Sequence, residues 1–78
     1  MLSIKKYSKL LKEIEKEPKT FTELVGKLSI QKGTLSKSLT QLRTNWLVLC
    51  KDKKYYLTMS GRYLLNIYKK IEAKHDIN

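Results

Sequence analysis

The sequence predicts a small α+β domain, mostly helical, in which a three-helix core is followed by a two-stranded β-hairpin and a closing helix. Three observations support this prediction. Apolar residues recur at helical spacing in four separate segments. Two short β-prone runs flank a charged turn between the third and fourth segments. The length of 78 residues allows one modest core, so we expect residues 1–78 to form a single domain.

The first helix is expected over residues 3–17, with Ser3 as a candidate N-cap. Apolar residues, among them Tyr7 and Leu11, recur there at helical spacing. Pro18 follows and ends the helix, because the residue before a proline is pushed out of helical backbone geometry.

A second, short helix is expected over residues 21–28. Thr20 and Glu23 have the spacing of a capping box, in which each side chain accepts a hydrogen bond from the other residue's backbone N–H. A tight connection then leads into a third helix. Ser29 is favoured as the N-cap of that helix, because Gln31 is a poor capping residue.

The third helix is expected over residues 31–44 and is amphipathic. Leu35, Leu39 and Leu42 fall in one narrow sector at 100° per residue. With the preceding helix and the short turn, it makes a helix-turn-helix arrangement. The opposite face is polar and lacks acids, and it consists of Gly33, Ser36, Lys37, Thr40 and Thr44, flanked by Lys32, Thr34 and Gln41.

This polar face differs from that of a helix that only covers a core, which normally carries pairs of Glu and Lys. Small donors and acceptors flanked by cations suit a DNA major groove, where base edges are read by hydrogen bonds and phosphates by lysine or arginine. The alternative is an ordinary solvated face without acids. Gly33 either leaves room for a phosphate or base, or is simply tolerated near the helix end.

The hairpin is expected to pair strands 46–51 and 54–59. It must pack on the helices, because an isolated hairpin is marginal in water. Its tip carries Lys51, Lys53 and Lys54. These lysines either contact backbone phosphates beside the third helix or protect the hairpin from pairing with another sheet edge.

The closing helix is expected over about residues 61–74. Its apolar stripe is wide for the end of a small domain, which makes it a candidate dimerisation surface. The alternative is that the monomer's own core consumes the stripe. The candidate dimerisation residues are Leu64, Ile67, Tyr68 and Ile71.

The charge balance predicts a polyanionic partner. The chain has 17 basic and 7 acidic residues, a formal net charge of +10. Nucleic acid is the first candidate, an anionic membrane surface the second, and a merely basic soluble protein the third. A membrane role is disfavoured because the basic residues are spread over several elements. The sequence shows no membrane span and no signal peptide, so we expect a cytoplasmic protein.

Chemistry-bearing residues are few. Cys50 is the only cysteine and stands in an apolar run, so we expect a buried structural thiol and no disulfide. One cysteine and the lone His75 cannot make a zinc site, and we expect no metal and no cofactor. No nucleophile–base set, carboxylate pair or phosphate-binding glycine loop is present, which argues against an enzyme.

The order of these elements resembles that of the winged helix-turn-helix family of DNA-binding regulators, over nearly the whole chain. The Leu57–Thr58 pair followed by Gly61 looks like the signature with which the second wing strand enters the closing helix in MarR- and PadR-like and small archaeal, plasmid and viral regulators. The residues that carry the resemblance are Glu23, Leu24, Leu28, Ile30, the segment 33–39, Leu42, Leu47, Val48, Tyr56, Leu57, Thr58, Gly61 and Arg62.

Two positions depart from the family pattern. Trp46 stands where the family usually has glycine before the first wing strand, which makes Asn45 a candidate for the left-handed turn. Gln31 stands where the family usually has a serine cap.

The resemblance implies a sequence-specific, double-stranded DNA-binding transcriptional regulator, with two copies per site and a homodimer at least on DNA. The alternative is a winged-helix module that binds protein or RNA. No small-molecule effector is evident. The implied DNA-binding residues are Gln31, Lys32, Gly33, Thr34, Ser36, Lys37 and Thr40 on the helix and Lys51, Lys53 and Lys54 on the wing, with Arg43 and Arg62 flanking them.

Overall fold

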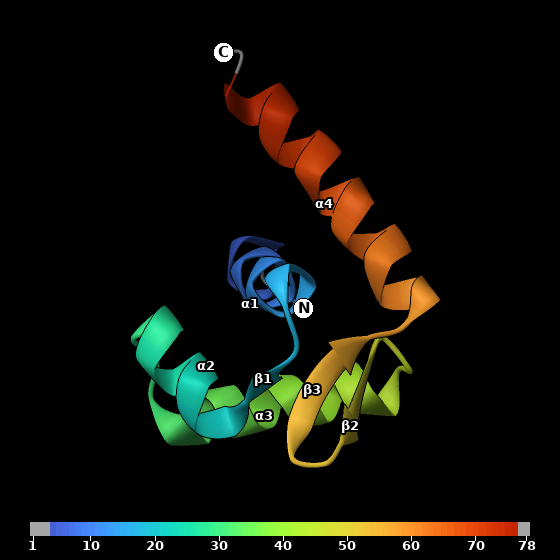
Figure 1. The fold of residues 1–78 in the computed structure, drawn as a ribbon. Helices are drawn as coiled ribbons and strands as arrows, with labels where there is room; N and C mark the ends of the chain where they lie inside the picture. The colour runs from blue at the N-terminus through green and yellow to red at the C-terminus, as the bar shows by residue number, and fades with distance from the viewer. Residues whose placement is uncertain (1–3, 77–78) are drawn as a thin grey trace.

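The computed structural model describes the backbone of residues 4–76 and the side chains of residues 6–73 (Figure 1). Ser3, the candidate N-cap, lies outside the described residues. Four helices and three short strands follow one another in the order α1 Ile4–Lys16, β1 Lys19–Thr20, α2 Phe21–Leu28, α3 Lys32–Thr44, β2 Val48–Lys51, β3 Lys54–Leu57 and α4 Met59–Asp76. The predicted fold class is confirmed, with one additional strand.

The additional strand, β1, extends the hairpin into an antiparallel sheet of order β1-β3-β2. β1 pairs Lys19 with Tyr55, and β2 pairs Val48 with Leu57 in the hairpin. Sequence periodicity did not reveal β1 because two residues are too few to show an alternating pattern. Its pairing ties the start of α2 to the hairpin.

The core lies between the helices and the base of the hairpin, with α3 below α1 (Figure 1). The three leucines of the α3 seam are almost fully buried, as their spacing predicts. Their burial fixes the rotation of α3 and turns its polar face outward. The buried apolar residues are Tyr7, Leu10, Leu11, Ile14, Leu24, Leu35, Leu39, Leu42, Val48, Leu65 and Tyr68.

Lys19 links β1 to the end of α1. Its side chain is only 4% exposed, and its ammonium donates to the backbone carbonyls of Glu13 at 2.5 Å and Glu17 at 3.3 Å. The carbonyls in the last turn of a helix lack partners within the helix, so a cation is favourable there. The Glu13 carboxylate lies 3.9 Å from the same ammonium, which leaves the buried charge paired.

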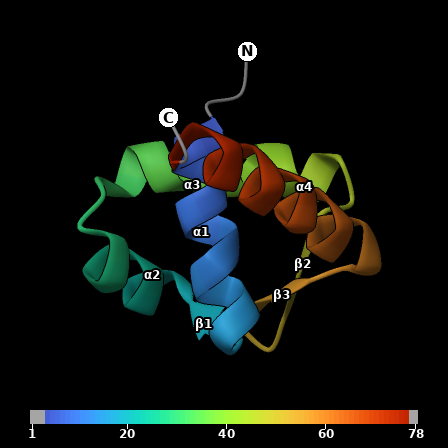
Figure 2. The ribbon, with the colours of Figure 1, turned by 90° about the horizontal axis from the view of Figure 1, so that it is seen from above.

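α4 crosses α1 (Figure 2), and polar side-chain contacts join the two helices. The Ser8 hydroxyl donates to Glu72 Oε1 at 2.6 Å, and the Lys12 ammonium lies 3.1 Å from the same oxygen. Lys69 and Glu15 form a second ion pair at 2.9 Å. Together with the buried Tyr68, these contacts fix where α4 leaves the domain.

The turn between α3 and β2 corrects one sequence prediction. Asn45 has φ −93°, whereas Trp46 has φ 58° and takes the left-handed conformation that Asn45 was expected to take. β2 therefore begins at Val48, two residues later than expected. The Thr58 hydroxyl donates to the Trp46 carbonyl at 2.6 Å and Thr58 N–H to the Leu47 carbonyl at 3.1 Å.

The junction between β3 and α4 also differs from the expectation. Gly61 N–H donates to the Thr58 hydroxyl at 2.9 Å, so α4 starts at Met59 and β3 ends at Leu57. A Cβ added to Gly61 would lie 2.0 Å from the Leu47 carbonyl oxygen. The strand-to-helix turn therefore needs glycine at this position, because the Leu47 backbone passes too close for a side chain.

Two further predictions are wrong. Ser29 does not cap α3; it is the left-handed C-cap of α2 with φ 50°, and Gln31 is the N-cap of α3 without a side-chain hydrogen bond. Cys50 is exposed instead of buried, because only Val48 at the start of β2 reaches the core, and the strand then continues toward the exposed hairpin tip.

Candidate nucleic-acid interface

The polar face of α3 points to solvent. Its outward position follows from the leucine seam, because residues opposite a buried sector must face away from the core. Thr34 is half-buried, and the other expected contact residues on α3 are exposed, namely Gln31, Lys32, Gly33, Ser36, Lys37, Thr40 and Arg43.

The hydroxyls on α3 differ in what they offer a ligand. Thr40 donates its proton to the Ser36 carbonyl at 2.9 Å, so in this conformation it presents an acceptor to solvent. The Ser36 hydroxyl is exposed, and no described residue bonds to it. Ser38 was not singled out in the sequence; it is buried and donates to the Thr34 carbonyl at 3.0 Å. Its spacing from Leu35 and Leu42 was the available signal.

The N-terminus of α3 is open to anions. Gln31 gives the helix no side-chain cap, so the N–H groups of the first turn lack the partner that a serine would supply. Gly33 lies in that turn, and a Cβ built there meets nothing within 4 Å. The fold therefore does not require glycine at position 33, which leaves tolerance and close ligand approach both open.

The hairpin tip carries three exposed lysines, Lys51, Lys53 and Lys54. Asp52 and Lys53 have φ 51° and 66°, the positive values that a two-residue type I′ turn requires. The register places Lys51 directly opposite Lys54. Like charges in directly opposed positions destabilise a sheet. A bound anion would therefore reduce the repulsion between the two ammonium groups.

The hairpin tip and the outer side of α3 lie toward the same side of the molecule, at the bottom of Figure 1. From Lys32 to Leu57 the chain has six cations, namely Lys32, Lys37, Arg43, Lys51, Lys53 and Lys54, and one carboxylate, Asp52. This side therefore combines an acid-free helix face with a basic tip, a distribution that favours contact with a polyanion.

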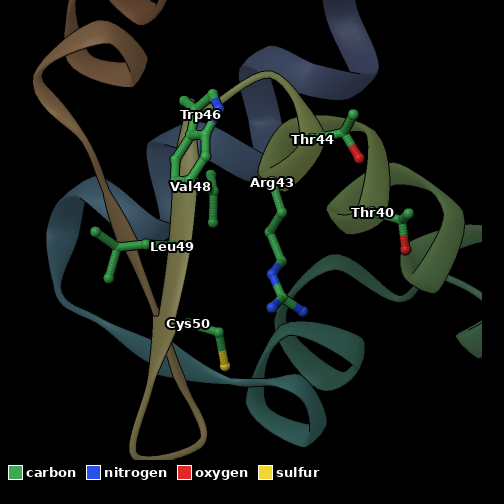
Figure 3. Close-up of a pocket in the computed structure, with 7 residues that line it drawn as sticks. All are labelled: Thr40, Arg43, Thr44, Trp46, Val48, Leu49 and Cys50. Atoms are coloured by element: carbon green, nitrogen blue, oxygen red, sulfur yellow. The ribbon is translucent and has the colours of Figure 1, made fainter.

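A groove of about 400 Å³ separates the C-terminal half of α3 from β2 (Figure 3). Arg43 extends from α3 alongside β2, and Trp46 stands at the end of the groove where β2 begins. Trp46 is 78% exposed. The lining residues are Thr40, Arg43, Thr44, Trp46, Val48, Leu49 and Cys50.

Tyr55 lies opposite Cys50 in the hairpin, on the strand next to β2. Burial raises the pKa of the Tyr55 phenol above its ordinary value of 10.0, and the Cys50 thiol adds to the rise. Arg43 acts in the opposite direction and lowers the pKa of the phenol, because a cation favours the ionised form. Tyr55 is therefore neutral at physiological pH and leaves the charge of Arg43 uncompensated.

The expected dimerisation residues are only partly at the surface. Tyr68 is buried in the chain's own core, and Leu64 and Ile71 are half-buried. Ile67 is 36% exposed and continues an apolar line formed by the exposed side chains of Met59 and Tyr63, four residues apart along α4. The monomer thus consumes one side of the stripe and leaves another open.

Among the described residues, no three His, Cys, Asp or Glu side chains gather to hold a metal ion. None of the helices in residues 4–76 is long and apolar enough to cross a bilayer.

A comparison with protein-family models assigns nearly the whole chain to one kind of domain. A family model described as winged helix-turn-helix covers residues 3–76. The match includes α3, the β2–β3 hairpin and α4, the elements that build the surface described above. No curated protein matches the chain.

Proposed function

The chain belongs to the winged helix-turn-helix family, and from this premise we propose that it is a sequence-specific transcriptional regulator acting on double-stranded DNA in the cytoplasm. The family assignment indicates DNA binding, and such domains are typically not enzymes. In this family's terms α3 is the recognition helix and the β2–β3 hairpin is the wing.

The observation that carries the proposal is the exposed face of α3. It presents two lysines, a glutamine and hydroxyl groups but no carboxylate, and the leucine seam fixes its direction. A helix of this kind enters the major groove, where the edges of the four base pairs differ in their hydrogen-bonding pattern. The other three helices and the sheet leave this face of α3 uncovered.

The side chains of α3 have two different roles in this proposal, phosphate binding and base reading. Lys32 and Lys37 bind phosphates and supply an attraction that is independent of sequence. The base-reading candidates differ in what they can donate or accept, which is what distinguishes one base edge from another. They are Gln31, Thr34, Ser36 and Thr40, and each good contact supplies about 1–3 kcal/mol of discrimination.

The wing and the flanking arginines contact the DNA backbone in this proposal. Lys51, Lys53 and Lys54 meet phosphates next to the groove that α3 occupies, which relieves the repulsion between Lys51 and Lys54. Arg43 and Arg62 are exposed at the C-terminal end of α3 and the start of α4, where they neutralise further phosphates.

A homodimer with two copies on each DNA site completes the proposal. The exposed line of Met59, Tyr63 and Ile67 on α4 supports it, because a second α4 would cover apolar side chains that water now surrounds. Ile71 borders this line, whereas Leu64 and Tyr68 serve mainly the monomer. Two-fold symmetry of the dimer predicts a palindromic site.

Selection of bound duplexes from a random DNA pool tests the regulator proposal. We expect a short motif in two inverted copies, with tighter binding to that motif than to a scrambled duplex at two salt concentrations. A module that binds protein or RNA would select no motif. Absence of any preference among duplexes would therefore contradict the proposal.

Light scattering of the protein on the selected duplex tests the dimer. Ile67→Glu should reduce the complex from two copies to one by placing a charge in the apolar line. Asn66→Glu is the matched control, because Asn66 is an exposed polar neighbour on α4. One-to-one binding by the unmodified protein at high concentration would contradict the proposed dimer.

A further inference from the structure

Trp46 has an unusual combination of backbone conformation and exposure. Its φ of 58° is a left-handed conformation that is strained for an L-residue, and its side chain is 78% exposed. Packing in the free chain therefore does not account for a bulky aromatic at this position. Strained residues of this kind cluster at active sites and ligand-binding sites.

The groove beside Trp46 has the chemistry of a nucleotide site. Its described lining offers an indole face, a guanidinium and the hydroxyls of Thr40 and Thr44, and it contains no carboxylate. None of the ion pairs in the described part of the chain involves Arg43. An unpaired base can stack on an indole, and its phosphate can bind a guanidinium, which is how single strands are held.

The shape of the groove favours a strand over a small molecule. It is open along β2 (Figure 3), so a chain can pass through it. One wall is the C-terminal half of α3, and Thr40 belongs both to this wall and to the face assigned to duplex DNA. A strand leaving the duplex at α3 can therefore enter the groove directly.

We propose that the groove between α3 and β2 binds unpaired nucleotides of single-stranded DNA next to the duplex, with a base stacked on Trp46 and a phosphate on Arg43. The inference deepens the proposed function and rests on it for the position of the duplex. It assigns the protein a preference for DNA in which paired and unpaired segments meet.

Trp46 is the only tryptophan, so its fluorescence reports directly on this groove. Titration with short oligo(dT) should quench the emission, because stacking brings the base against the indole. A selected duplex that carries a single-stranded tail should bind more tightly than the same duplex with blunt ends. The expected difference is about tenfold, as for one base stacked on an aromatic side chain.

Trp46→Gly provides the matched variant, because glycine accepts the positive φ and the fold is retained. Fluorescence anisotropy of labelled DNA should show the loss of the roughly tenfold advantage of the tailed duplex, with blunt-duplex affinity unchanged. Trp46→Phe, which keeps an aromatic face, should retain most of the advantage. Lys37→Ala should instead weaken the binding of blunt and tailed duplexes by the same factor.

These arms separate failure of the groove assignment from failure of the regulator proposal. Selection of a duplex motif without quenching by oligo(dT) would overturn the groove assignment alone. Quenching and a tail advantage without any motif would overturn only the regulator proposal.

Two other occupants are also tested. Quenching by an RNA strand but not by the DNA strand would overturn the assignment to DNA. A change of Trp46 emission on dilution of the protein without nucleic acid would assign the indole to a contact between copies, and would overturn the groove assignment.

Discussion

Trp46 illustrates how a single residue can depart from the requirements of its turn. The path from α3 into β2 needs a left-handed residue, and the backbone N–H groups of Trp46 and Leu47 donate to Arg43 and Leu42 at 3.0 Å and 2.9 Å. Glycine would make this turn without a Cβ penalty. The sequence alone showed that Trp46 replaces the glycine usual in the family. The prediction that Asn45 takes the left-handed conformation was wrong, because Trp46 itself takes it.

Trp46→Gly should stabilise the free protein. Relief of the left-handed conformation is worth about 1–2 kcal/mol, and the greater entropy of an unfolded glycine offsets about 0.5–1 kcal/mol of it. Thermal unfolding should thus show a net gain of up to about 1.5 kcal/mol. Trp46→Ala, which keeps a Cβ, is the control and should show no such gain. A lower melting temperature for the glycine variant would mean that the exposed indole stabilises the fold.

Gly33→Ala distinguishes the two explanations of Gly33. Alanine at this open helical position should raise stability by up to about 1 kcal/mol, because it restricts the unfolded chain and favours the helix. If a phosphate or base approaches closely, the added methyl group should also weaken duplex binding, and this is the result we expect. Unfolding and anisotropy measurements on the same variant check both effects. Unchanged affinity would show that glycine is only tolerated there.

At the scale of the element, the start of α2 was predictable because its signal is local. Thr20 N–H donates to Glu23 Oε1 at 2.9 Å and Glu23 N–H donates to the Thr20 hydroxyl at 3.2 Å, as the four-residue pattern indicates. The turn from α3 into β2 was not predictable, because distant contacts of Trp46 and Leu47 with Thr58 and Gly61 decide it. β1 was missed for the same reason, since its partner lies far along the chain.

The capping box makes stability depend on pH. Hydrogen bonds from Thr20 lower the pKa of the Glu23 carboxyl below its ordinary value of 4.5. A lowered pKa in the folded state stabilises the protein above the ordinary value, and this contribution is lost as the pH falls through the lowered pKa. The melting-temperature difference between the unmodified protein and Glu23→Ala should therefore be larger at pH 7 than at pH 3.

Glu17→Ala is the control for this experiment. Glu17 is exposed, and within the described residues its carboxylate makes no hydrogen bond, so its removal should give little dependence on pH. Equal pH dependence of both variants would contradict the assignment to the capping box.

The wing turn combines strain and charge in Lys53. Lys53→Gly should stabilise the hairpin, because φ 66° suits glycine at the second position of a type I′ turn. The same change should weaken duplex binding and reduce the slope of log K against log salt by about 0.9, as for one lost phosphate contact. Lys53→Asn, which also tolerates positive φ, should reproduce the loss of slope. An unchanged slope in both variants would show that Lys53 of the wing does not contact DNA.

At the scale of the whole molecule, the fold was predictable because local and global signals agree. Leucine spacing, the capping box and the β-prone runs all lead to one arrangement, and the family match covers the same residues. Which side of α4 packs against the core was less predictable. Whether Leu64, Ile67 and Tyr68 face the core or solvent depends on the crossing with α1, which sequence periodicity cannot specify.

The charge of the whole surface sets the salt dependence. If the six cations between Lys32 and Leu57 all meet phosphates, log K should fall with log salt with a slope of about −5. A slope measured on the selected duplex near this value would indicate that α3 and the wing bind together. A slope near −2 would limit the contact to one element.

We infer that the exposed face of α3 contacts duplex DNA specifically. Lys37 lies on this face, whereas Lys70 is an exposed lysine in the C-terminal half of α4. That half of the helix lies away from α3 (Figure 1). The most direct test measures the affinity of Lys37→Ala and Lys70→Ala for the selected duplex by fluorescence anisotropy. Loss of at least about fivefold for Lys37→Ala, with Lys70→Ala within about twofold of the unmodified protein, is the predicted result. Equal losses for the two variants would show that the protein binds DNA only as diffuse positive charge and would contradict the claim.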